Sequence, residues 1–394
     1  MLSFHVFGQQ WCTSEPTNID TTVKKMPARA KTEITIPIVV HVIYTEAEEN
    51  TPDTQIHAQI DALKQDFRAL NSDLPNVINH YTNKVADMEI NFELATTDPQ
   101  GNPHSGIIRQ VVPPSFWNTT TSSDGRRRIC YDDLNGSSAW CTDCYLNIWV
   151  VKKVSNAAFA GIGIFPTQIG NDVPKEEDGV YIRYNRFGVS PPDQLGRTAT
   201  HEIGHYLNLL HPWGANDPGS DCNATACCQN PLYDDYIEDT EWQIKTYLNE
   251  CPTGLQQSCG AADNYQNFMG YATDECLIMF TNGQKARVWD ALMTYRSGLL
   301  NPNCMANCVV STNTPTPIDE WLGAAWINGR QLRMDIKTNN LNWELYDLQG
   351  RLINQWTSRF TGFQTVVVPN LSQGVYLLKA QKGNRFGVRK LLLP

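Results

Sequence analysis

The residues with the clearest chemical potential lie between positions 201 and 211, where the chain reads HEIGHYLNLLH. His201 and His205 are four residues apart, so on a helix both imidazoles project from one face and can bind the same metal ion. Glu202 then lies beside the ion without binding it, in a position to take a proton from a water that the ion activates. This spacing predicts a catalytic helix over roughly residues 194–208.

A third histidine, His211, follows His205 by six residues, which is not a helical spacing. It reaches the same ion only if the helix ends and the chain turns back. Asn208 suits such a turn, because asparagine tolerates the left-handed backbone region better than most residues. Pro212 then prevents the helix from continuing. Three histidines and one water predict an open tetrahedral zinc site of the catalytic type.

Three alternatives compete with this interpretation. An ordinary amphipathic helix with surface histidines explains the apolar stripe of Ile203, Leu207 and Leu210, but not Glu202 and the third histidine together. A secreted binding or adhesion protein with a structural zinc site has no need of Glu202. A peptidase of the thermolysin type takes its third ligand from a distant glutamate, which leaves His211 without a role.

The elements that must position these residues follow from hydrophobic periodicity. Strands and one amphipathic helix, over residues 53–70 and ending at Leu70, precede the histidines. This order predicts an α/β (α+β) domain with a twisted mixed sheet over the active-site helix and a loop-rich lower half at 212–266. The stretch 158–165 is the candidate edge strand for an antiparallel peptide, and its glycines fit either close backbone approach or a bulge. The expected strands cover 34–44, 88–94, 145–151, 159–165 and 180–184.

A second motif, NFMGY, lies some sixty residues downstream at 267–271. Together with HEIGHYLNLLH it resembles the metzincin metallopeptidases, in which an HExxHxxGxxH helix is followed by a methionine-containing turn. Within the metzincins the chain is most similar to the pappalysin family, in its ulilysin or cytophagalysin branch, over about residues 33–300. Asn208 stands where the general pattern has glycine, and the turn described above tolerates it.

The resemblance implies roles for particular residues. The three histidines would bind zinc, and Glu202 would be the general base and then the proton donor to the leaving amine. Met269 would form the apolar floor of the site. Tyr271 would contact zinc or the tetrahedral intermediate, and the alternative for it is a buried aromatic with a satisfied hydroxyl. Family members also favour Arg or Lys beside the scissile bond.

An acidic run, YDDYIEDT, lies in the loop-rich half at 233–240. Oxygen ligands gathered in a constrained loop are what calcium requires, and the resembling family binds structural calcium in this region. Asp235, Asp239 and Thr240 match its pattern best, although Glu241 replaces an expected proline. The alternative is a solvated acidic turn.

Twelve cysteines are dispersed from Cys12 to Cys308 without a CxxC ladder, which predicts disulfides and an oxidising compartment. The resemblance suggests one bridge between Cys251 and Cys276, and one from Cys259 to either Cys227 or Cys228. The sequence does not resolve the pairing of Cys222, which lies in the same local cluster. Local pairs fit two further groups, although sequence does not fix their connectivity: Cys130, Cys141 and Cys144, and Cys304 with Cys308.

Both ends of the chain predict processing and export. Residues 1–10 resemble the tail of a secretory signal, and residues 11–32 are a candidate propeptide with cleavable basic sites. Cys12 is a candidate latency switch that fills the open zinc position, or else an ordinary disulfide partner or free thiol. Residues 306–318 are rich in Thr and Pro and predict a linker after a peptidase domain at 33–305.

Residues 319–394 alternate in polarity between glycine turns and predict an all-β sandwich. The segments WELYDLQGRLI, LSQGVYLLKA and RKLLL resemble the C-terminal sorting domains that bacteria of the Bacteroidetes type export through the type IX system. The alternative is a carbohydrate- or protein-binding sandwich. The resemblance implies a bacterial protein, secreted or attached to the cell surface, whose partner is the secretion machinery.

Composition narrows the function classes. A formal net charge of −10 argues against nucleic-acid binding, and no apolar run approaches the length of a membrane span. The sequence therefore predicts a secreted zinc endopeptidase, with structural calcium, that acts on protein or peptide substrates. The cleavage specificity and the oligomeric state are not apparent from it.

Overall fold

The computed structural model divides the chain into two compact units, Met1–Cys308 and Val309–Pro394, and each is described by itself. The predicted signal remnant at 1–10, the candidate propeptide at 11–32 with Cys12, and most of the linker lie outside the described residues. No helix in the described part of the chain is both long and apolar enough to cross a membrane. The structure describes residues 33–156, 159–190, 194–214, 228, 230, 233–301, 304, 314–315, 318–328, 330–369, 371–382 and 385–393.

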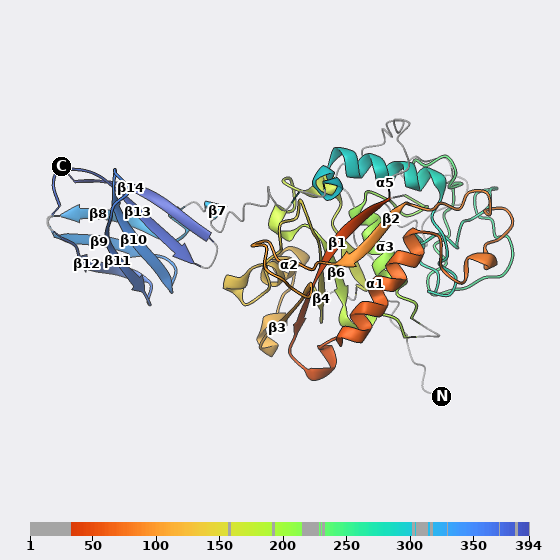
Figure 1. The fold of residues 1–394 in the computed structure, drawn as a ribbon, viewed down its shortest axis with the longest axis horizontal. Coiled ribbons are helices and arrows are strands. Elements are labelled where there is room, and N and C mark those ends of the chain that lie inside the picture. The colour runs from red at the N-terminus through yellow and green to blue at the C-terminus, as the bar shows by residue number, and fades with distance from the viewer. Residues whose placement is uncertain are drawn as a thin grey trace. The chain divides into compact units, whose positions relative to one another are not determined.

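The first unit is built on a six-stranded sheet of order β2-β1-β4-β6-β5, with β3 also paired to β1 (Figure 1). All its pairs are parallel except β5 with β6, which is antiparallel. The mixed sheet and the edge position of β5 confirm the prediction, whereas β3 and α2 were not predicted. The elements are β1 Ile34–Tyr44, α1 Asp53–Phe67, β2 Ile90–Leu94, β3 Ile107–Val111, α2 Ser122–Cys130, β4 Leu146–Val151, β5 Gly161–Gly163, β6 Val180–Arg183, α3 Arg197–Tyr206 and α5 Asn282–Thr294.

Helices α1 and α3 pack together and against the sheet (Figure 1). The predicted apolar stripe of α1 is buried from Ile56 to Phe67. The prediction that the stripe and the helix extend to Leu70 was wrong. The helix ends at Phe67, and Ala69 has a positive φ of 49°. Leu70 is 69% exposed. A positive φ cannot continue a right-handed helix, so the side chain of Leu70 turns away from the stripe.

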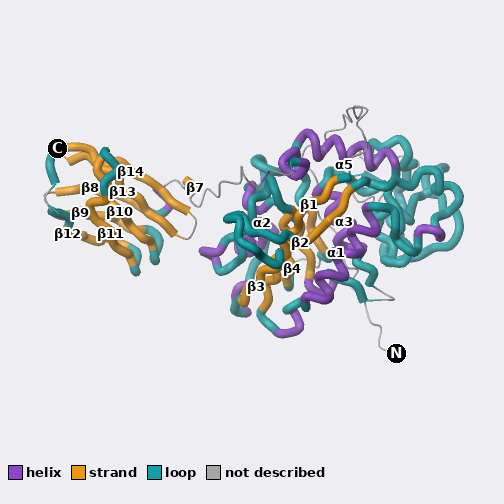
Figure 2. Tube along the Cα trace, viewed as in Figure 1, coloured by secondary structure: helices purple, strands orange, loops and turns teal. Residues whose placement is uncertain are grey.

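Helix α3, which carries His201 and His205, is shorter than the predicted 194–208 and is buried along its whole length. Its N-terminus follows Gly196, which has a φ of 85°. Asp274 takes the place of a local cap, because its carboxylate accepts hydrogen bonds from the backbone N–H groups of Leu195 and Arg197. The negative charge of a carboxylate at the N-terminus of a helix also interacts favourably with the helix dipole. The described residues between α3 and α5 form loops (Figure 2), as expected for the lower half.

Three disulfides join described residues. Cys228–Cys259 and Cys251–Cys276 are the two pairs that the resemblance implied, with Cys228 chosen over Cys227. Local pairing of the other two groups was wrong for Cys144, which is bonded to Cys304 across a sequence separation of 160. Cys130 is a buried free thiol beside the hydroxyl of Tyr181, and Cys141 is also disulfide-bonded. Cys222 and Cys308 lie outside the described residues.

The second unit contains two sheets, of order β11-β10-β13-β14-β7 and β12-β9-β8. Alternate residues of β9 and β10 point into one core, which includes Leu332, Met334, Leu341 and Trp343. The all-β prediction is confirmed. The strands are β7 Thr314–Pro315, β8 Leu322–Asn328, β9 Gln331–Ile336, β10 Leu341–Asp347, β11 Leu352–Ser358, β12 Gly362–Val367, β13 Gly374–Lys382 and β14 Arg385–Leu393.

Candidate active site

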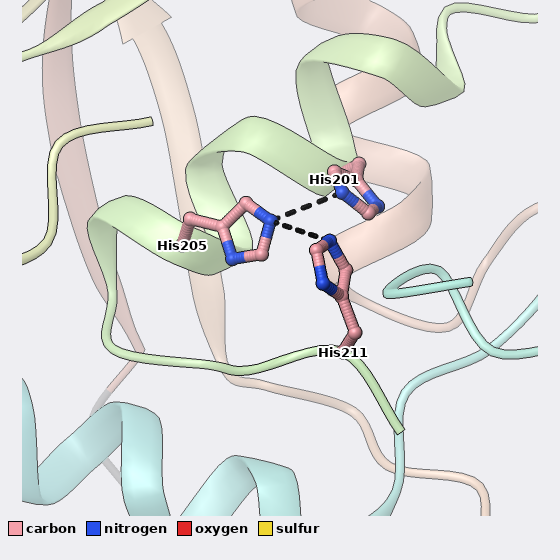
Figure 3. A group of neighbouring side chains, drawn as sticks. All are labelled: His201, His205 and His211. Carbon is pink, nitrogen blue, oxygen red and sulfur yellow. Dashed lines mark hydrogen bonds between the residues drawn. The ribbon is translucent and has the colours of Figure 1, made fainter. Parts of the chain in front are cut away.

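The three histidines of the motif converge on one point (Figure 3). Nε2 of His205 lies 3.1 Å from Nε2 of His201 and 3.1 Å from Nε2 of His211. Zinc bonded tetrahedrally to imidazole nitrogens at 2.0–2.1 Å would hold them about 3.3 Å apart. Among the described residues this is the one group of three or more His, Cys, Asp or Glu side chains arranged to hold a metal ion.

Two of these rings are oriented by backbone carbonyls. Nδ1 of His201 lies 2.8 Å from the carbonyl oxygen of Phe268, and Nδ1 of His205 lies 2.8 Å from that of Leu209. A carbonyl only accepts, so each Nδ1 carries the proton and each Nε2 presents a lone pair. Burial lowers the pKa of His201 to about 4 and that of His205 well below its usual value. The rings are therefore neutral, as metal ligands must be.

The turn after α3 brings His211 back to the helix. Asn208 has a φ of 72°, in the left-handed region that was predicted for it. The N–H of Leu209 then donates to the carbonyl of Gly204, and the N–H of Asn208 to that of His205. These two hydrogen bonds satisfy carbonyl groups of the last helical turn, which is how a residue in the left-handed conformation, here Asn208, ends a helix.

Glu202 is a residue of α3, and its side chain lies against the edge strand β5. The residue is 1% exposed. A Cβ added to Gly161 would be 2.6 Å from Cγ of Glu202 and 2.8 Å from its Oε1. A Cβ added to Gly163 would be 2.1 Å from the carbonyl oxygen of Glu202. The two glycines of the edge strand therefore serve close backbone approach, one of the two readings that the sequence left open.

Met269 and Tyr271 lie beside the histidine cluster. Met269 is fully buried, and a Cβ added to Gly204 would lie 2.2 Å from its Sδ, so the turn packs directly against α3. The ring centroid of Tyr271 is 4.8 Å from that of His211 and 5.8 Å from that of His201. The structure thus places Met269 and Tyr271 of the second motif next to the histidine cluster.

Of the three predicted calcium ligands in the acidic loop, Asp235 and Thr240 are in direct contact, whereas the side chain of Asp239 is engaged elsewhere. The Oδ1 atom of Asp235 accepts hydrogen bonds from the N–H of Ile237 and from the hydroxyl of Thr240, at 3.0 and 2.7 Å. The carboxylate of Asp239 instead accepts from the hydroxyl of Thr281 and the N–H of Gly283, at the start of α5.

Comparison with protein-family models gives two matches. Residues 130–293 match the peptidase M43 family, described as pregnancy-associated plasma protein-A. Residues 329–393 match the secretion system C-terminal sorting domain. The first match covers the catalytic helix and the methionine turn, and the second covers most of the C-terminal unit.

Similar proteins agree with these matches. An extracellular metalloprotease of Arthroderma otae is 29% identical over 271 residues, which is 67% of this chain and 80% of that protein. A solved structure of mirolysin in complex with compound 9 is 32% identical with a TM-score of 0.56, and the match covers 69% of this chain and 97% of the mirolysin chain. Mature mirolysin of Tannerella forsythia with a cleaved peptide is 31% identical with a TM-score of 0.54, over 69% and 99%.

The chain belongs to the pappalysin family of metallopeptidases. It is a metalloendopeptidase. Its sorting domain makes it a bacterial pappalysin that is secreted or held at the cell surface. The sequence-based expectations of family, enzyme class and destination are therefore confirmed.

This pappalysin has a buried residue at the end of its catalytic helix that the sequence did not reveal. Arg296 forms a bidentate ion pair with Asp178, at 2.6 and 3.0 Å. It also donates to the carbonyl of Tyr206, the last residue of α3, and to that of Ile164, beside the edge strand. These partners are 90 to 132 residues away, so no local pattern identifies Arg296.

The contact between β5 and Glu202 predicts a large effect of a small substitution. Gly161→Ala is expected to lower kcat by about 100-fold, because a misplacement of the order of 1 Å has that cost. The metal content should stay unchanged, since the three atoms nearest to the added methyl group all belong to Glu202 and not to a histidine. Ile162→Val, in the same strand but packed in another core cluster, is the control for altered strand packing. Equal kcat values for wild type and Gly161→Ala, measured on a peptide substrate, would contradict this role of the glycine.

Proposed function

We propose that this metalloendopeptidase is zinc-dependent, with His201, His205 and His211 as ligands and Glu202 as general base. The observation that supports it best is the convergence of the three Nε2 atoms. The donor set fits zinc, because three neutral imidazoles with one open position form its usual catalytic site. A third histidine at the cluster also argues against a thermolysin-type site with a distant glutamate.

Bound zinc would polarise the scissile carbonyl and lower the pKa of the attacking water. Glu202 would take a proton from that water and later give it to the leaving amine. The side chain of Tyr271, beside two of the histidines, would hydrogen-bond the oxygen of the tetrahedral carbon. Met269 would support the ligands from below, and an extended substrate would lie antiparallel to β5.

Cleavage of casein with and without a chelator tests the proposal. We expect a zinc chelator to remove activity and added zinc to restore it, while the related binding-protein hypothesis predicts no cleavage in either state. Activity that survives complete removal of the metal would contradict the proposal.

We further propose that the acidic loop binds a structural calcium ion through Asp235 and Thr240. Asp235 is fully buried, and burial raises the pKa of its carboxyl from 3.8 to about 8. Its Oδ2 has no hydrogen-bond partner among the described residues. A buried polar atom without a partner is costly, and a hard cation with oxygen ligands would satisfy it. Asp239, which is engaged with α5, would contribute to the ion only through its backbone.

Calcium is accordingly expected to raise the unfolding temperature of the zinc-loaded enzyme, and Asp235→Asn to remove that response. The carboxyl with a raised pKa contributes stability below pH 3.8 and loses it as the pH rises through about 8. The calcium effect should therefore be larger at the alkaline end, and about 2.7 kcal/mol at a hundredfold excess over Kd. Calorimetry with Asp61→Asn, an exposed aspartate, provides the control. The same calcium response in wild type and Asp235→Asn would contradict the site.

A preference for Arg or Lys beside the scissile bond and a latent precursor are further parts of the proposal. The family resemblance and the net charge of −10 support the preference, and profiling of cleaved peptides by mass spectrometry tests it. A solved structure of Tannerella forsythia promirolysin, 31% identical with a TM-score of 0.56, supports a propeptide at 11–32.

A further inference from the structure

The three histidines are not held in the same way. His201 and His205 each direct Nδ1 at a backbone carbonyl, from Phe268 and Leu209. No acceptor for Nδ1 of His211 is present among the described residues, and the interactions of its ring are with other rings. A ligand histidine normally has such a partner, which fixes the plane of its ring. Within the described part of the chain, neighbouring rings are what contacts the imidazole of His211.

Two aromatic rings surround it. Trp213 is stacked on His211 with centroids 4.9 Å apart and an interplanar angle of 14°. Tyr271 meets the same imidazole edge-on at 4.8 Å and 67°, and meets Trp213 at 4.8 Å and 69°. Trp213 is 1% exposed, and Ala160, just before the edge strand, completes this small buried cluster.

The backbone places Trp213 in this position. The N–H of Gly214 donates to the carbonyl of His211 at 2.8 Å, which closes a tight turn over residues 211–214. Gly214 leaves the turn with a φ of 86°, which favours glycine. The turn brings the side chains of residues 211 and 213 face to face, two positions apart.

We propose that Trp213 is a positioning residue that holds the third metal ligand through ring stacking. Its flat face takes the part that a carbonyl acceptor takes for the other two histidines. Stacked aromatic pairs have a preferred geometry, and a rigid, buried indole restricts rotation of the imidazole. The proposal rests on the proposed function in one respect, since it takes His211 to be a ligand.

The proposed role of Trp213 depends on its ring and not on a hydrogen bond from its indole nitrogen. Nε1 of Trp213 is buried without a hydrogen-bond partner among the described residues. Since the N–H makes no such bond, a phenylalanine ring should replace the indole, whereas an aliphatic side chain of similar polarity should not.

The chain supplies a matched control at the second histidine. Phe165 lies against His205 with centroids 5.1 Å apart and an interplanar angle of 43°. His205 already has its carbonyl partner, so loss of that aromatic ring should matter little for its orientation. Phe165→Leu removes a ring contact from His205, which keeps its carbonyl partner. Trp213→Leu removes a comparable ring contact from His211, which has no such partner among the described residues.

The test is the zinc affinity of the full chain, measured by competition with a chromophoric chelator. We expect Trp213→Leu to weaken zinc binding by about 10- to 100-fold, the usual effect of losing a residue that orients a ligand. Trp213→Phe and Phe165→Leu should stay within about threefold of wild type. The absorption spectrum of the cobalt-substituted protein should change in Trp213→Leu alone, because it reports ligand geometry rather than stability.

Two results would overturn the proposal: equal losses for Trp213→Leu and Phe165→Leu, or no recovery in Trp213→Phe. Failure of the underlying function looks different. His211→Ala would then bind zinc as tightly as wild type, whereas failure of the stacking role alone leaves His211→Ala weak and Trp213→Leu normal.

Discussion

Glu202→Ala is expected to lower kcat/KM by about 10³-fold while the protein keeps its zinc. General base catalysis contributes about 10²- to 10⁴-fold, and no other acidic side chain is implicated in proton transfer at the described site. The carboxylate is buried between α3 and β5, so bulk water cannot easily take its place. Zinc binding should remain, because the three ligand rings are held by other contacts.

Peptide hydrolysis and metal content are measured on the same preparation. Glu202→Gln should be equally inactive, since an amide is similar in shape but accepts no proton. Glu177→Gln changes another buried glutamate, which is paired with Arg126, and should keep its activity. Undiminished cleavage by Glu202→Ala would refute the mechanism, and loss of zinc would assign Glu202 a structural role instead.

Arg296→Met is expected to lower the free energy of unfolding by about 3–5 kcal/mol, the usual cost of removing one partner from a buried ion pair. The guanidinium of Arg296 and the carboxylate of Asp178 are both buried. The substitution removes the guanidinium and leaves the negative charge of Asp178 buried without its partner. It also removes the donors to Tyr206 and Ile164. Because these carbonyls belong to the end of α3 and the segment after β5, we expect kcat to fall as well.

Urea unfolding of the metal-free and zinc-loaded forms measures the first effect. Arg126→Met is the matched control, since its guanidinium is more exposed and pairs with Glu177 alone among the ion pairs. The double variant Arg296→Met with Asp178→Asn should recover part of the loss, because no unpaired charge remains. A loss no larger than that of Arg126→Met would show that the buried pair does not hold the helix.

The parts of the site that could be predicted are those encoded within a few residues. The helical spacing of His201 and His205 and the turn at Asn208 are local properties, and the structure places all three as expected. The stretch 158–165 was also predicted as the edge strand, and β5 lies at the edge of the sheet; its glycines allowed either close backbone approach or a bulge. The prediction for Leu70 was wrong because spacing alone does not show where a helix ends.

The remaining parts depend on contacts between distant segments. Asp274 caps α3 from 77 and 79 residues away, and Arg296 reaches Asp178 across 118 residues. Trp213 is close to His211 in sequence, but its role became apparent only when the ring geometry showed the stacking. The pairing of Cys144 with Cys304 likewise depends on the folded path of the chain, which cysteine spacing does not encode.

That disulfide has a consequence for where the enzyme can act. It encloses a loop with a sequence separation of 160 that contains α3, the methionine turn and α5. In the chain-entropy model, a link of this length destabilises the unfolded ensemble by about 5 kcal/mol. A reducing cytoplasm withholds this contribution, and an oxidising exterior supplies it. The fold that carries the histidine cluster is therefore expected to be more stable after oxidation outside the cytoplasm than before it.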